Sequence, residues 1–162
     1  MLIDLTTLTW VHTLLSLVAI VAGIVVVQAL IGSRMPGGWT ALYLVTAILT
    51  SVTGFGFPFD RFIDSHWLGV ASLVAFALVL LARYAFRLAG AWRWVYALGM
   101  VLGLWFLVVV LIAQAFKKVP ALTALAPTQA EPPFLVAQVF ALVIFALVAI
   151  AAARKFRPAG RS

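Results

Sequence analysis

Five long apolar runs occupy most of the chain, and most of the charged residues lie in the segments between them. Each run is close to the roughly 20 residues that an α-helix needs to cross a hydrocarbon core about 30 Å thick. The pattern therefore predicts a single transmembrane domain over residues 1–162. Its five predicted spans are Leu8–Ile31, Trp39–Phe57, Ser65–Phe86, Trp92–Phe116 and Phe134–Ala153.

The second predicted span is the most polar of the five. Its hydroxyl residues are Thr40, Thr46, Thr50, Ser51 and Thr53. Such side chains can hydrogen-bond to the backbone of their own helix, so they do not prevent a crossing. Five crossings are therefore expected.

Composition supports the same fold class. Hydrophobic residues make up 66% of the chain and charged residues 9%, against about 45–50% and about 25% in soluble domains. Lipid must cover that much apolar surface, so the chain is expected to be an all-α integral membrane helical bundle. There is no cysteine, which excludes disulfides, thiolate metal sites and cysteine nucleophiles.

The distribution of basic residues predicts the orientation, because Lys and Arg accumulate on the cytoplasmic side. With the N-terminus outside, three basic residues face outward: Arg61, Lys117 and Lys118. The inner side then holds Arg34, Arg83, Arg87, Arg93, Arg154, Lys155, Arg157 and Arg161. The predicted topology is N-out/C-in. These residues lie at span ends rather than on one exposed face, so the expected partner is the lipid bilayer and not nucleic acid.

The two histidines, His12 and His66, both fall at the predicted outer boundary of the membrane. Asp60 and Asp64 lie beside His66, four residues apart, and would share one face of a helix. Ionisable side chains at this depth are costly to bury, and they therefore suggest a functional site.

Three interpretations of this cluster stay open. His12 and His66 would ligate the iron of a b-type haem, because helical bundles place such ligands on facing helices. The set His12, His66, Asp60 and Asp64 would instead hold a divalent metal ion, since imidazole and carboxylate suit zinc, manganese or iron. An interfacial polar network without any cofactor is equally consistent with these residues.

No catalytic motif is present: the chain has no His-Glu-x-x-His, no Gly-rich phosphate loop and no serine elbow. Whether it is an enzyme is uncertain, and redox or electron transfer would be the expected activity. The sequence thus predicts a small membrane protein that binds haem or a metal ion at its periplasmic face. The alternative is a non-enzymatic component without a cofactor, either an accessory subunit of a larger membrane complex or part of a homo-oligomeric channel or transporter.

The connection Lys117–Pro133 is the only long one. Its apolar stretch Val119–Leu125 is expected on the outer membrane surface, and a solvated connector fits equally well.

Two stretches, Thr53–Arg61 and Ala126–Pro133, resemble small uncharacterised bacterial inner-membrane proteins with no assigned activity. The similarity extends over nearly the whole length. It implies a multi-pass protein of the bacterial inner (plasma) membrane, and it brings no functional residue with it.

Overall fold

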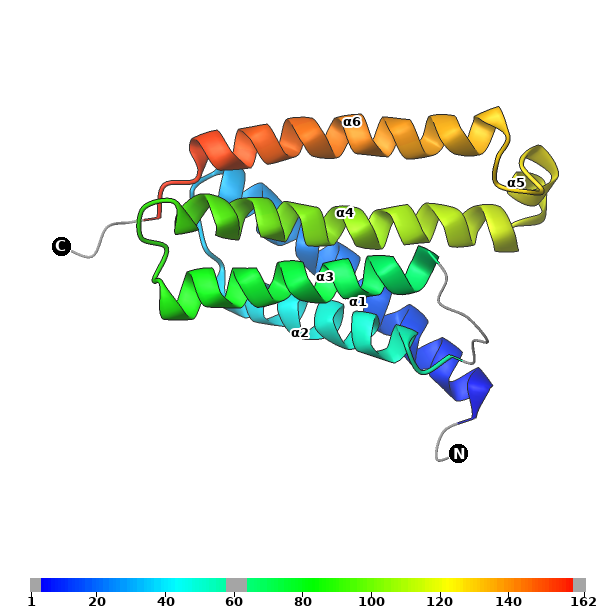
Figure 1. Ribbon diagram of the computed structural model, residues 1–162, viewed down its shortest axis with the longest axis horizontal. Coiled ribbons are helices and arrows are strands. Elements are labelled where there is room, and N and C mark those ends of the chain that lie inside the picture. Colours follow the sequence, from blue (N-terminus) through cyan, green and yellow to red (C-terminus); the bar gives the residue numbers. More distant parts are fainter. Residues whose placement is uncertain (1–3, 58–63, 159–162) are drawn as a thin grey trace.

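The protein is described here by a computed structural model that covers residues 4–57 and 64–158, with side chains resuming at His66. All the regular structure in these residues is helical (Figure 1). The elements are α1 (Leu5–Ile31), α2 (Gly37–Gly54), α3 (Asp64–Leu80), the π-helical turn η1 (Leu81–Ala85), α4 (Trp92–Lys118), α5 (Pro120–Leu125) and α6 (Pro132–Lys155).

Four of these helical segments are long and apolar enough to cross a membrane: α1, α3 continued by η1, α4 and α6. This finding fits a multi-pass membrane protein. The 18-residue helix α2, which carries the hydroxyl residues named above, is not among the four.

Helices α1 to α4 form a four-helix bundle. α2 packs against α1 and α3, while α4 packs against α3 and α1, and successive helices run antiparallel (Figure 1). α6 lies outside this bundle along α4 and has a smaller contact with α1. The antiparallel course brings the starts of α1, α3 and α6 to one end, together with the ends of α2 and α4.

We call this end the histidine end, because His12 and His66 lie there. The opposite end is called the basic end. Its basic residues are Arg34, Arg83, Arg87, Arg93, Arg154, Lys155 and Arg157. The three acidic residues that the structure describes, Asp4, Asp64 and Glu131, belong to the histidine end.

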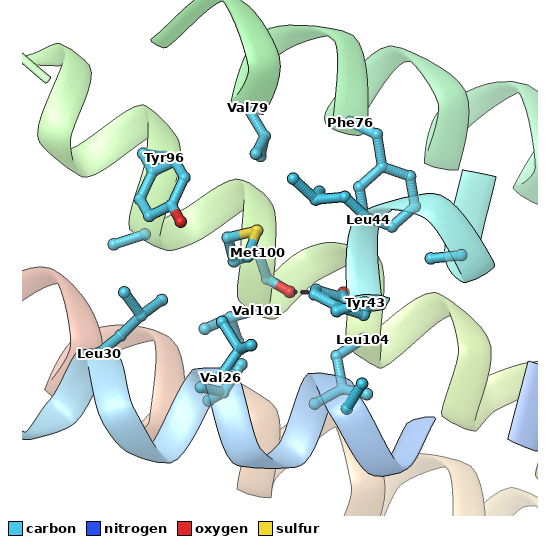
Figure 2. Close-up of a cluster of buried hydrophobic side chains, with 14 of the residues drawn as sticks. Val26, Leu30, Tyr43, Leu44, Phe76, Val79, Tyr96, Met100, Val101 and Leu104 are labelled. Carbon is cyan, nitrogen blue, oxygen red and sulfur yellow. Dashed lines mark hydrogen bonds between the residues drawn. The ribbon is translucent and has the colours of Figure 1, made fainter. Parts of the chain in front are cut away.

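Two tyrosines anchor the bundle core (Figure 2). Tyr43 is fully buried, and its hydroxyl donates to the Met100 carbonyl at 2.9 Å. The Tyr96 hydroxyl accepts from Arg83 Nη1 at 3.1 Å. Because an unpaired buried hydroxyl is costly, these bonds help to fix how α2 and η1 pack against α4.

Two glycines bring α3 and α4 close together. A Cβ on Gly103 would lie 2.5 Å from the ring of Phe76, and one on Gly99 would lie 2.5 Å from a methyl group of Val79. Small residues at such positions let helix backbones approach in membrane proteins, where van der Waals packing drives association.

The segment that follows α6 adds to the contact between α6 and α4. Within the helix only Ala141 and Ala152 are buried. Phe156 beyond its end is 1% exposed and packs on Tyr96, with 5.7 Å between the ring centres. Arg93 donates to the Phe156 carbonyl, and Ser33 Oγ pairs with the backbone of Arg157. These contacts tie the last turn of α6 to the basic end of the bundle.

The long connection before α6 contains the short helix α5, which sequence analysis did not specify. Thr123 Oγ1 donates to the Phe116 carbonyl, and Gln129 Nε2 donates to the Ala113 carbonyl at 2.7 Å. The segment therefore folds back on the end of α4. Its location at the membrane surface stays a prediction.

Candidate functional site at the histidine end

His12 lies in the first half of α1, and its partly buried ring contacts the last turn of α2. Its Nδ1 is 2.9 Å from Thr53 Oγ1. The ring of Phe57 meets it edge-on, with 5.4 Å between the centres and an interplanar angle of 88°. Gly54 leaves space beside the ring, since a Cβ there would be 3.6 Å from His12 Cε1. The imidazole is therefore held by α2 on one side.

The hydroxyl of Thr53 is a hydrogen-bond partner for one nitrogen of His12. Thr53 Oγ1 donates to the Leu49 carbonyl at 2.8 Å, so its oxygen has a lone pair to accept a proton carried on His12 Nδ1. In a neutral imidazole with a proton on Nδ1, the lone pair is on Nε2. Ligating histidines typically bond through one nitrogen and donate a hydrogen bond from the other, so Nε2 is the ligand atom that His12 offers.

His66 lies in the first turn of α3 and is 6% exposed. Its ring is 5.7 Å from that of Phe55, tilted by 37°. One turn further along α3, Gly69 faces the same Phe55 ring, because a Cβ on Gly69 would lie 3.2 Å from two atoms of that ring. His66 is thus buried against the segment that ends α2.

The structure brings both histidines to the same end of the bundle. They come from α1 and α3, the two helices that flank α2, and both rings contact residues 53–57. Asp60 lies outside the described residues. Asp64 starts α3, but its side chain is not described. Among the side chains that are described, no three His, Asp or Glu residues lie close enough to hold a metal ion. That Asp60 and Asp64 contribute to a metal site therefore stays a prediction.

The remaining acid near α1, Asp4, caps that helix. Its carboxylate accepts from the Thr7 amide at 2.7 Å and from the Thr7 hydroxyl. These hydrogen bonds lower the pKa of Asp4, because they favour the charged form. Its function in the structure is to cap α1 rather than to approach either histidine.

The sequence pattern does not indicate Thr53 and Phe57 as partners of His12. It predicts that Thr53 bonds to its own helix backbone, which the structure confirms, while the contact of Thr53 with His12 spans 41 residues of sequence. Local spacing carries no signal for a pairing between two different helices.

The chain matches no protein-family model, no curated protein and no solved structure. The resemblance to small bacterial inner-membrane proteins therefore stays a prediction. The interpretation of the site rests on its own geometry.

Proposed function

We propose that the chain is a five-span protein of a bacterial inner membrane, with its N-terminus outside. Its histidine end, facing the periplasm, binds haem or a divalent metal ion through His12 and His66 and serves electron transfer. Topology and ligand binding are supported by different observations and are tested separately.

The case for α2 as a fifth span is that three of its hydroxyls are satisfied within the helix. Thr46, Thr50 and Ser51 each donate to the carbonyl four residues earlier, at 2.7, 2.8 and 3.1 Å. A hydroxyl bonded in this way does not need water, so the helix can lie in lipid. The concentration of Lys and Arg at the basic end supports placing that end in the cytoplasm.

The single observation that carries the ligand proposal is the hydrogen bond between His12 Nδ1 and Thr53. It holds the ring in one orientation and leaves the Nε2 lone pair available for coordination. His66 would supply the second imidazole from the same end of the bundle. Haem ligated by two histidines, or a metal ion completed by carboxylates, would then be held next to the last turn of α2.

An absorption spectrum and an elemental analysis of the purified protein test this proposal. Haem binding should give a Soret band, and metal binding should give about one equivalent of metal without that band. His12→Ala and His66→Ala should each remove most of the bound ligand. A protein with neither haem nor metal, even after supplementation with both, would refute the ligand proposal.

A second candidate function is that of a non-enzymatic accessory subunit or oligomer component without a cofactor. It is favoured by α6, which has only two buried residues along its 24-residue length. Its exposed apolar side chains include Val136, Phe140, Leu147 and Ile150. Chemical cross-linking in native membranes should then give one defined oligomer or heteromer. A monomer that carries stoichiometric haem or metal would exclude this candidate.

A further inference from the structure

An apolar groove lies between α3, α4 and α6, outside the core of the four-helix bundle. Its volume is about 410 Å³, within the range of about 300–1,000 Å³ that is common for ligand sites. The twelve lining residues are Ala75, Leu78, Val95, Leu98, Gly99, Val101, Leu102, Trp105, Leu142, Phe145, Ala146 and Ala149. Their side chains are aliphatic or aromatic, so the groove suits hydrocarbon.

The groove has the length of one membrane leaflet. Along α4 it extends from Val95 to Trp105, which is about 15 Å at the helical rise of about 1.5 Å per residue. A hydrocarbon core is about 30 Å thick, so the groove covers about half of it. Trp105 lines the end toward the middle of the bundle, and Val95 lies at the end near the start of α4.

Two cationic side chains of α6 lie beyond the end of the groove marked by Val95 and Ala149. On α6, the exposed side chain of Arg154 follows Ala149 by five residues, or about 8 Å along the helix axis. Lys155 is exposed beside it.

We propose that this groove binds one acyl chain of an anionic phospholipid, with the lipid phosphate at the basic end near Arg154 and Lys155. The apolar lining suits an acyl chain, and the length of the groove suits a lipid of one leaflet. The positive charge at the basic end suits an anionic headgroup. All described acids lie at the opposite end, so nothing described at the basic end repels the phosphate. Basic clusters beside transmembrane helices attract anionic headgroups by the same physics.

Native mass spectrometry with added lipid tests the proposal. Phosphatidylglycerol and phosphatidylethanolamine with identical acyl chains are titrated separately into delipidated protein. One phosphatidylglycerol per chain should bind at least fivefold more tightly than phosphatidylethanolamine, and the difference should shrink as ionic strength rises. Equal affinities for the two lipids would overturn the proposal.

Charge variants locate the headgroup. The double variant Arg154→Gln/Lys155→Gln should weaken phosphatidylglycerol binding by about fivefold for each charge removed and leave phosphatidylethanolamine binding unchanged. The matched control Lys117→Gln/Lys118→Gln removes two charges at the histidine end and should have no effect. An equal loss in both double variants would indicate attraction to net charge alone and would contradict the assigned position.

Groove variants locate the acyl chain. Ala146→Phe places a large ring in the groove and should reduce phosphatidylglycerol binding at least tenfold; Ala146→Leu gives a smaller filling side chain if the first variant does not fold. Ala41→Phe, at an exposed position on α2 outside the groove, is the control. Unchanged binding in a folded Ala146 variant would overturn the proposal. So would a dimer in which a second copy of the chain covers the groove and excludes lipid.

Discussion

The orientation of the His12 imidazole depends on a single hydroxyl, that of Thr53. A proton on Nδ1 donated to Thr53 would fix both the ring plane and the tautomer. Residues that hydrogen-bond to the free nitrogen of a ligating histidine typically change metal affinity by about 10–100-fold when they are removed.

Thr53→Val keeps the shape of the side chain and removes the acceptor. If His12 is a ligand, haem or metal affinity should fall at least tenfold in an absorbance or metal titration. Thr50→Val is the matched control, because the Thr50 hydroxyl bonds only to its own helix. Equal affinity in the Thr53 variant and the wild type would show that this hydrogen bond does not prepare a ligand.

Glu131 organises the turn that starts α6, and this makes the turn sensitive to pH. Its carboxylate accepts from the Thr128 hydroxyl at 2.8 Å and from the amides of Thr128 and Ala130. These hydrogen bonds lower the pKa of Glu131 from its ordinary value of 4.5, and the bond from the Thr128 side chain has the largest effect. The stabilisation of this turn by Glu131 is thus complete at pH values above the ordinary pKa. It is lost as the pH falls through the lowered pKa of Glu131.

Hydrogen exchange checks this pH dependence. In the wild type, protection of the Thr128 and Ala130 amides should be constant near neutral pH and should fall below about pH 4.5 as Glu131 takes up a proton. Glu131→Gln should show weak protection at every pH. Asp4→Asn, which alters the cap of α1 instead, should leave these two amides unaffected.

At the scale of the helices, the contact between α3 and α4 depends on the missing side chain of Gly103. A methyl group there would meet the ring of Phe76, which packs edge-on against Tyr43. Gly103→Ala should destabilise the fold by about 1–2 kcal/mol. Overpacking costs about 1–3 kcal/mol, and the higher helix propensity of alanine offsets at most about 1 kcal/mol of that cost.

Unfolding in mixed detergent micelles measures this difference. Gly38→Ala is the control, since nothing lies within 4 Å of a Cβ at that position. That variant should be as stable as the wild type or slightly more stable. A Gly103 variant with unchanged stability would show that Phe76 moves away at no cost.

The apolar runs predicted the helices well, because hydrophobic length is a local property of the sequence. α1 starts three residues before its predicted span, α4 ends two residues after its span, and α6 extends two residues beyond its span at both ends. α2 starts two residues before the predicted span and ends at Gly54 instead of Phe57, within the glycine- and phenylalanine-rich stretch. By contrast, the pairing of Thr53 with His12, the position of Phe156 and the groove beside α6 depend on which helices are neighbours. Hydropathy does not contain that information.

At the scale of the whole molecule, the number and direction of crossings can be tested by single-cysteine labelling, which the cysteine-free chain makes simple. With five crossings and the N-terminus outside, Thr6→Cys and Ala130→Cys should react with an impermeant maleimide in intact cells. Gly37→Cys and Ala89→Cys should react only after the cells are opened. If α2 does not cross, Thr6 and Ala130 would instead lie on opposite sides of the membrane.

The attachment of α6 through Phe156 has a consequence for biogenesis. Helices α1 to α4 precede Phe156 in synthesis, so Tyr96 is translated before its partner. The last helix can enter the lipid by its own hydrophobicity and pack along α4, yet its last turn is secured only when the residues after it have been translated. Insertion of α6 and docking of its last turn are therefore separate events, and a bulky fusion placed directly after Arg157 would interfere with the second while leaving the first intact.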